Sequence, residues 1–301
     1  MILSKFCSIY DAQIKSHIDY IIKTFECDWG PIIYTLDKGR NRFRSTLAVI
    51  SGNINHLDPE ISSTLGAICE LLHTAIIIQD DISDQDNFRR GDIAAWKKFG
   101  IGRVLFSCEQ VITIAMLNSI SIMKNETIIS LLETLFEVNQ GQSMQARSSF
   151  KDDLSEDTFR KMHHYKTALG RWAITCPCKI NPDNKLFNVF DQFARLLGEA
   201  GTIKNDLENI ILDNEYDSVN MDLSIGRVTL PLLLLVKSVP TITENSARPT
   251  IKKLLYHNGV YDTCKVIIKR CVNQAIQLLQ EIPQSKDREL LIEWAKYHLQ
   301  V

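Results

Sequence analysis

A helical pattern of apolar residues that ends in four carboxylates constrains this chain more than any other feature. From Leu65 to Ile78 the apolar residues recur at helical spacing, which predicts one helix that begins near Pro59 and continues into the acidic segment. The carboxylates stand at Asp80, Asp81, Asp84 and Asp86. Asp80 and Asp84 would lie on one helix face, where like charges repel each other. Mg²⁺, bound through carboxylate and phosphate oxygens, reverses that repulsion. The segment therefore predicts a metal site, and the alternative is a solvated acidic helix end.

Composition favours an all-α protein that forms one domain. Glycine (13) and proline (8) are scarce for 301 residues, and no regular series of short alternating strands occurs. We expect a single domain over residues 1–301, because no repeat, low-complexity tract or linker divides the chain. The net charge of −2 gives no basic footprint, so we exclude nucleic acid as a partner.

Cysteine usage and the length of the apolar runs indicate a reducing compartment. The eight cysteines form neither a CxxC pair nor a Cys/His array with zinc spacing, and most lie in apolar helical contexts, as buried free thiols do. The longest apolar run, 230–236, contains Pro231 and is far shorter than the ~18 residues of a membrane span. We expect a cytoplasmic protein without a transmembrane segment.

The other periodic segments predict further helices separated by polar turns. We expect them at residues 4–25, 46–50, 102–123, 127–146, 156–176, 185–213 and 232–236, with three more in the C-terminal part. On the helix expected at 185–213, Asn205, Asn209 and Asp213 step by four residues and line one face. Helical bundles build metal sites from such facing helices, and the alternative is a polar helix end.

Several segments together resemble the trans-prenyltransferase family, the all-α synthases of isoprenyl diphosphates, in both order and spacing. The segment from Asp80 to Asp84 is the DDxxD motif itself, and Arg89-Arg90-Gly91 follows at the usual distance. The other matching segments lie at residues 42–44, 71–75, 141–145, 166–168, 197–200 and 222–231. The resemblance implies a helical bundle of the isoprenoid synthase type around a central cavity, and a homodimer.

The resemblance also implies roles for individual residues. Asp80 and Asp84 would bind Mg²⁺, as three ions together with the allylic isoprenyl diphosphate, and Asp81 would support them. Further metal ligands would be Asn205, Asn209 and Asp213. Arg89 and Lys166 would hold the same diphosphate. The acceptor, isopentenyl diphosphate, would be bound by Arg42, His73 and Arg90. Further substrate contacts would come from Gln142, Lys204 and Arg227.

The chain departs from the family pattern at four places near the diphosphates. The second DDxxD motif reads Asn205-Asp-Leu-Glu-Asn209, the usual Phe-Gln upstream of it is Gly201-Thr202, and lysines expected in the family are Asn41 and Asp217. An amide binds a cation more weakly than a carboxylate does. The Asn205, Asn209 and Asp213 pattern meanwhile resembles the Asn/Ser/Glu metal triad of class I terpene cyclases.

Three hypotheses follow. The chain is a prenyltransferase that joins an allylic diphosphate to isopentenyl diphosphate or to a divergent acceptor such as an aromatic ring. Alternatively it is a terpene cyclase on the same scaffold, or a non-catalytic partner subunit of another synthase. Ala75, five residues before Asp80, is small, so we expect an open tunnel that accommodates a C15 to C20 chain.

Overall fold

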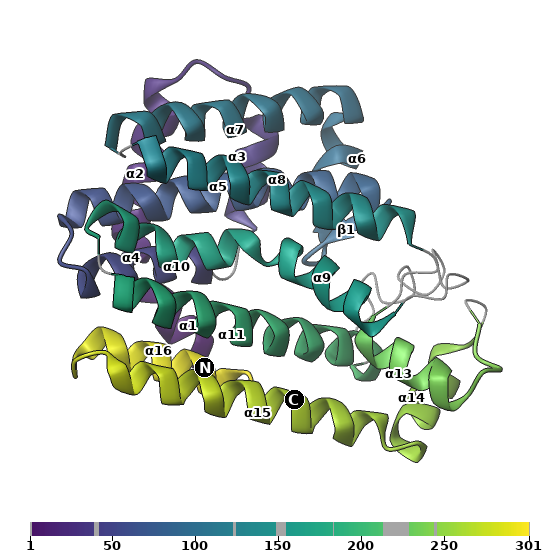
Figure 1. The fold of residues 1–301 in the computed structure, drawn as a ribbon. Coiled ribbons are helices and arrows are strands. Elements are labelled where there is room, and N and C mark those ends of the chain that lie inside the picture. The colour runs from purple at the N-terminus through teal and green to yellow at the C-terminus, as the bar shows by residue number, and fades with distance from the viewer. Residues whose placement is uncertain are drawn as a thin grey trace.

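The fold is all-α, as the composition predicts. The computed structural model describes residues 2–38, 42–122, 125–148, 155–182, 184–212, 229–243 and 246–300. Within these residues the only strands form one antiparallel hairpin, in which Phe88 pairs with Ile93. Figure 1 shows the long helices lying side by side in layers, from α7 at one side of the molecule to α15 and α16 at the other.

The first half of the chain contains the hairpin and the helices that surround α5. Its elements are α1 (Ile2–Ser8), α2 (Asp11–Thr24), α3 (Gly30–Asp37), α4 (Phe43–Ile54), α5 (Pro59–Ser83), β1 (Phe88–Arg89), β2 (Asp92–Ile93), α6 (Ala95–Phe99), α7 (Ile101–Ile122) and α8 (Asn125–Arg147). The second half is built on α11. Its elements are α9 (Glu156–Lys166), α10 (Ala168–Ile180), α11 (Asn184–Ile211), α13 (Leu230–Ser238), α14 (Arg248–His257), α15 (Val260–Leu278), the 3-10 turn Leu279–Glu281 and α16 (Lys286–Tyr297).

Helix α5 has the predicted bounds and is buried on two sides. Asp58 caps it by accepting a hydrogen bond from the backbone N–H of Glu60 (2.8 Å), and Pro59 takes the first turn, where no N–H is needed. Its apolar residues belong to two buried clusters. One cluster contains Ala67, Leu71, Ala75 and Ile78, and the other contains Leu65, Ile68, Cys69 and Leu72. This double burial explains the nearly continuous apolar pattern before Asp80.

Two expected helices are each divided into two. The segment 4–25 forms α1 and α2, and the hydroxyl of Tyr10 at the break donates a hydrogen bond to Asp287 (2.6 Å). The segment 156–176 forms α9 and α10, which meet at Thr167. The Thr167 hydroxyl donates to the carbonyl of His163 (3.0 Å), a local bond that competes with the helix backbone. Apolar periodicity does not report such bonds, so the sequence did not predict these breaks.

Among the described residues, two helices have the length and mean hydropathy of a membrane span, although neither contains an uninterrupted apolar run of that length. The expectation from the sequence counted uninterrupted apolar residues, whereas a helix with scattered polar residues can be as apolar on average. Of the apolar window in α5, 72% is buried inside the protein, as in a core helix; in residues 101–120 of α7 the share is 33%. A cytoplasmic location therefore stays a prediction.

The two ends of the described chain pack together. The ring of Phe6 in α1 stacks on that of Trp294 in α16 at 6.0 Å between centroids. That the whole chain forms one domain stays a prediction, which this contact supports. All eight cysteines are free and seven are buried, as the sequence predicts.

Candidate active site

The acidic end of α5 places its carboxylates in different surroundings. The helical hydrogen bond from the N–H of Asp84 to the carbonyl of Asp80 (2.8 Å) continues the last turn, so these two residues share a face. Asp80 is partly exposed and Asp84 is buried. Asp81 is only 1% exposed. Asp80 and Asp84 therefore share a helix face, as the sequence predicts, whereas Asp81 is directed into the protein. That Asp80 and Asp84 bind a metal stays a prediction.

Arg89 of the hairpin holds Asp81. Its Nε donates to Oδ1 of Asp81 (2.7 Å), its Nη2 makes a second bond to the same oxygen, and Nη2 lies 3.2 Å from Oδ2 of Asp86. Burial raises the pKa of Asp81 to about 6, although Arg89 acts against that shift. The indole of Trp96 donates to the carbonyl of Asp86 (2.7 Å) and fixes this corner. Arg89, predicted to hold the allylic diphosphate, is thus already paired with two carboxylates.

Lys166 brings a positive charge to Asp80 from the end of α9. Its Nζ lies 4.0 Å from Oδ1 of Asp80 and donates to the side-chain oxygen of Gln145 in α8. Gly141 makes this approach possible, since a Cβ there would lie 2.8 Å from the backbone nitrogen of Lys166. Gln142 follows on the same helix and is partly buried. Three segments far apart in the sequence thus meet at Asp80.

The residues predicted to bind the acceptor form a second group around Glu70. Arg42 pairs with Asp11 and its Nε lies 3.9 Å from buried Glu70. The hydroxyl of Ser45 also donates to Glu70 (2.6 Å).

Arg44 and His73 complete this second group. Nη1 of Arg44 lies 2.7 Å from Nε2 of His73. Burial lowers the pKa of His73 well below its ordinary value, and the nearby Arg44, Arg90 and Arg89 lower it further. Arg90 adopts a left-handed conformation (φ 56°) at the hairpin turn. The predicted Arg42 and Arg90 thus both act on the pKa of Glu70, and Arg90 acts on that of His73.

On α11, Asn205 and Asn209 lie one turn apart, as the sequence predicts. Asn205 is exposed and Asn209 is partly buried. Lys204, predicted to contact substrate, is buried and directed at the chain itself: its Nζ pairs with Glu208 and donates to the carbonyl of Gln300 (2.5 Å). Asp213, Asp217 and Arg227 lie outside the described residues, as does Asn41.

A cavity of about 190 Å³ opens between α4, α10, α11 and α16. We call it the aromatic cavity, because four aromatic rings line it: Phe43, Phe193, Trp294 and Tyr297. Arg44 and Asn205 also line it, so it borders both the acceptor residues and the altered motif. Thr167, the neighbour of Lys166, lies on its wall as well.

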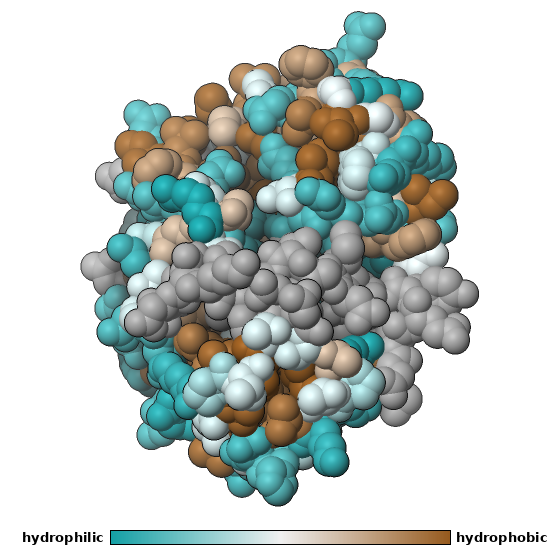
Figure 2. All heavy atoms as spheres, turned by 90° about the vertical axis from the view of Figure 1, so that its right-hand side faces the viewer, coloured by the Kyte–Doolittle hydropathy of each residue, from teal (hydrophilic) through white to brown (hydrophobic). Residues whose placement is uncertain are grey.

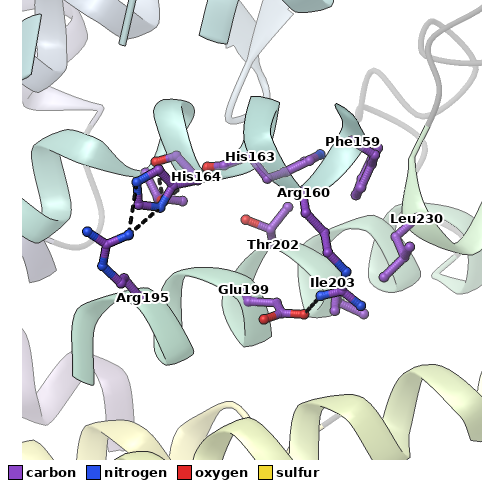
Figure 3. Close-up of a pocket in the computed structure, with 10 residues that line it drawn as sticks. Phe159, Arg160, His163, His164, Arg195, Glu199, Thr202, Ile203 and Leu230 are labelled. Carbon is purple, nitrogen blue, oxygen red and sulfur yellow. Dashed lines mark hydrogen bonds and ion pairs between the residues drawn. The ribbon is translucent and has the colours of Figure 1, made fainter. Parts of the chain in front are cut away.

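A smaller pocket of about 110 Å³ lies between α9, α11 and the start of α13 (Figure 3). Across it Arg160 pairs with Glu199, and Arg195 contacts the ring of His164 (3.1 Å). Burial, with Lys166 nearby, lowers the pKa of His163 to about 3; burial, with two arginines nearby, lowers that of His164 to about 4. Both imidazoles are therefore neutral near pH 7. Thr167 and Thr202 line this pocket and the aromatic cavity alike.

The donor set at Asp80 fits a hard divalent cation. Two carboxylates on one helix face, with a lysine 4.0 Å away for phosphate, match the preference of Mg²⁺ for few protein carboxylates and substrate oxygens. Among the described residues, no three His, Cys, Asp or Glu side chains converge on one point. A cation at Asp80 and Asp84 would thus need substrate or α11 oxygens to complete its coordination.

Several residues of the site were missed by assigning roles from the sequence. Arg44 and Gln145 lie in segments that match the family, but the resemblance implies no separate role for either, and no role is predicted for His298. Glu70 and His73 fit the Glu-x-x-His spacing of di-iron bundles, which require a second such element that the sequence lacks, and the structure instead places Glu70 beside Arg42 and Ser45. No sequence signal connects His298 to α11.

An all-α bundle in which a DDxxD helix end meets a lysine from another helix is the architecture of a helical isoprenyl synthase. The sequence model of the family Polyprenyl synthetase matches residues 30–268, and the chain belongs to that family of prenyl transferases.

Relatives and solved structures agree with this assignment. The chain is 27% identical to a decaprenyl-diphosphate synthase of Dictyostelium discoideum over 85% of its own length and 58% of that protein's length. It is 25% identical to the octaprenyl diphosphate synthase of Escherichia coli K12 (89% of this chain, 88% of that protein). Its fold matches that of a polyprenyl synthase of Caulobacter crescentus CB15, solved with calcium and isoprenyl diphosphate, with a TM-score of 0.90 at 18% identity over 99% and 98% of the two chains.

Proposed function

We propose that this chain is a Mg²⁺-dependent prenyltransferase that ionises an allylic isoprenyl diphosphate and joins the resulting cation to an acceptor. The observation that carries the proposal is the meeting of Asp80 and Lys166 at 4.0 Å, from two helices whose sequences both match the family pattern. A carboxylate beside a lysine is where a metal ion and a diphosphate can be bound together.

The residues around Asp80 can serve the ionisation step in distinct ways. When the allylic carbon–oxygen bond breaks, its electron pair leaves with the diphosphate, and fixed positive charge stabilises that leaving group. Lys166 is placed to supply such charge, and Arg89, held by Asp81 and Asp86, supplies it from the hairpin. Mg²⁺ held by Asp80 and Asp84 would add Lewis-acid stabilisation. The apolar side of α5, with Leu72 and Ile76, would shelter the cation from water.

The acceptor separates the hypotheses. Arg42 and Arg90 lie near the buried Glu70, and Arg90 lowers the pKa of His73, which supports an acceptor site in this region and hence a transferase. Asn205, which borders the aromatic cavity, supports the terpene cyclase as an alternative, because an amide replaces the usual carboxylate there. A non-catalytic partner subunit stays the third hypothesis, disfavoured by the intact Asp80 and Lys166 pair.

The length of the prenyl chain stays a prediction. Ala75 is completely buried in the cluster shared with α2, α3 and α7. The structure therefore does not confirm the open tunnel expected beside this residue. The expected C15 to C20 range rests only on the small size of Ala75.

We also propose a homodimer that forms through α7 and α8. Large apolar residues are exposed on these two helices: Ile101, Leu105, Phe106, Leu117, Ile120, Ile129, Leu132 and Phe136. In Figure 1 both helices lie on the outer side of the bundle. Figure 2 shows another face, the right-hand side of Figure 1, where hydrophobic residues are interspersed with hydrophilic ones in the upper and the lower part. We call the exposed apolar residues of α7 and α8 the apolar stripe, and such a stripe is typical of a protein interface.

Product analysis tests the proposal. The purified chain is given geranyl, farnesyl or geranylgeranyl diphosphate with Mg²⁺, with and without isopentenyl diphosphate. Diphosphate release and a longer or transferred prenyl product support a transferase. A hydrocarbon or alcohol formed without any acceptor would support the cyclase instead. No turnover alone, with turnover after adding another synthase, would support the partner subunit.

A further inference from the structure

The aromatic cavity has the apolar surface and the size to hold one aromatic molecule. The Trp294 ring packs against Phe43 (5.8 Å between centroids) and Phe193 (5.9 Å), so three lining rings support one another. Its volume of about 190 Å³ exceeds that of an engineered apolar cavity of about 150 Å³ that binds benzene. Aromatic rings also pair favourably with rings that line a site.

The charges on the cavity wall do not favour a diphosphate. Arg171 is paired with Glu137 and lies 3.5 Å from Asp191. Lys204 is paired with Glu208, and the carbonyl of Gln300 accepts a further bond from it. The Arg44 guanidinium is hydrogen-bonded to an imidazole and covers the ring of Phe43 at 4.4 Å. Two of the three lining cations are thus paired with carboxylates, which weakens their attraction for a diphosphate.

His298, which also lines the cavity, offers it a hydrogen-bond acceptor. Its Nδ1 lies 3.1 Å from the carbonyl of Trp294, and a carbonyl only accepts, so Nδ1 carries the hydrogen and Nε2 is the acceptor. Burial lowers the pKa of His298 to about 4, which keeps the ring neutral near pH 7. Nε2 reaches the wall because residue 201 is glycine: a Cβ there would lie 3.2 Å from it. The family's phenylalanine at this place would exclude the imidazole.

We propose that the aromatic cavity binds an uncharged aromatic acceptor whose N–H or O–H group donates a hydrogen bond to Nε2 of His298. The inference deepens the proposed function and rests on it, since the acceptor would receive the allylic group. The cavity borders Asn205 and Thr167, and through them the altered motif and Lys166.

The transfer balances without a further reactant. The allylic carbon–oxygen bond breaks, and its electron pair leaves with the diphosphate. A ring carbon or heteroatom of the acceptor forms the new bond to that carbon. The proton displaced from the acceptor passes to Nε2 of His298 or to the diphosphate.

Binding to the full chain, without Mg²⁺ or allylic substrate, gives the first test. The probes are 1-naphthol and 1-methoxynaphthalene, which differ in that the second lacks the O–H donor, and calorimetry measures their Kd values. We expect 1-naphthol to bind about tenfold more tightly than the methoxy analogue, the gain from one buried hydrogen bond. His298→Phe keeps a ring but removes Nε2 and should abolish this preference. His257→Phe, at an exposed histidine of α14, is the matched control and should keep it.

Each other result counts against the proposal. Equal binding of the two probes to the wild-type chain would overturn it, and this comparison stands even if His298→Phe fails to fold. Displacement of 1-naphthol by inorganic diphosphate would show that the cavity takes a charged ligand, which would also overturn it. Failure of 1-naphthol to bind would do the same.

A second arm separates this inference from the proposed function. With allylic diphosphate and Mg²⁺, mass spectrometry should detect prenylated naphthol. Elongation with isopentenyl diphosphate and no naphthol binding would sink the acceptor proposal while leaving the prenyltransferase intact. No diphosphate release from any allylic substrate would sink the proposed function, whatever the cavity binds.

Discussion

Nη1 of Arg44 donates a hydrogen bond to Nε2 of His73 across 2.7 Å, and this bond joins α4 to α5 at the predicted acceptor site. The direction is fixed because a guanidinium only donates, so the neutral imidazole accepts through the lone pair of Nε2. Three arginines near His73 and its burial keep its pKa low, and the ring therefore stays neutral through ordinary assay pH. His73 then orients Arg44 rather than adding positive charge itself.

Replacing Arg44 should impair the acceptor step more than ionisation. In Arg44→Gln, we expect acceptor-dependent product to fall about tenfold or more, since the charge-assisted hydrogen bond from Arg44 to His73 contributes ~1.5–3 kcal/mol. Diphosphate release without acceptor should change little. Product and released diphosphate are measured in parallel. Arg270→Gln, at an exposed position of α15, is the control. Equal losses in both readouts would show that Arg44 serves the whole site.

The three carboxylates of the acidic segment should respond differently to removal of their charge. Asp80→Asn and Asp84→Asn should abolish turnover with little loss of helical circular dichroism, because they would remove proposed metal ligands at the end of α5. Asp81→Asn should instead lower the free energy of unfolding by about 2 kcal/mol, because it removes one of the two buried carboxylate charges that pair with Arg89. Denaturant titration with Asp37→Asn as an exposed control measures this difference. Activity that survives in Asp80→Asn would contradict the metal site.

Gly141 should be required for the position of Lys166. In Gly141→Ala, the new Cβ would lie 2.8 Å from the backbone nitrogen of Lys166, so α8 and α9 must separate. We expect a loss of ~1–3 kcal/mol in unfolding free energy and a lower turnover. Gly102→Ala is the matched control, since no atom lies within 4 Å of a Cβ there and alanine favours a helix. A stable and fully active Gly141→Ala chain would refute this requirement.

How far the sequence predicts the structure depends on the range of the interactions. The apolar pattern of α5 predicts the bounds of this helix, because a helix buried on two sides has apolar residues in every turn. The family motifs predict that Lys166 lies near Asp80. The Lys204 side chain is held by the carbonyl of Gln300, 96 residues away, and Gly201 packs against the ring of His298. No local pattern reports such pairs. The sequence therefore predicted Lys204 as a substrate contact, whereas the structure places it against the C-terminal residues.

Acid should destabilise the protein through His163. In the unfolded chain a histidine has a pKa near 6.5, whereas burial and Lys166 lower the pKa of His163 in the folded chain to about 3. Between these two pH values the unfolded chain therefore binds one more proton than the folded chain. Stability is then full above pH 6.5 and falls as the pH drops toward 3. Between pH 7 and pH 5 we expect His163 to account for about 2 kcal/mol of lost unfolding free energy.

Urea titrations at the two pH values measure this contribution. His163→Phe keeps the ring contact with Phe159 and should make the loss smaller by that amount. His257→Phe, at an exposed histidine, should leave the loss unchanged. An identical pH response in His163→Phe and wild type would mean that His163 is protonated equally in both states.

The exposed apolar stripe on α7 and α8 should hold two copies of the chain together. Phe106 is 74% exposed and Phe136 is 63% exposed, and burial of such rings is a main driving force of association. The double substitution of both by glutamate should produce a monomer, since charges buried at an interface without partners cost several kcal/mol. Light scattering coupled to size exclusion measures the mass. Val266→Glu on α15, equally apolar and 67% exposed, should leave the dimer intact, and a monomeric wild-type chain would refute the interface.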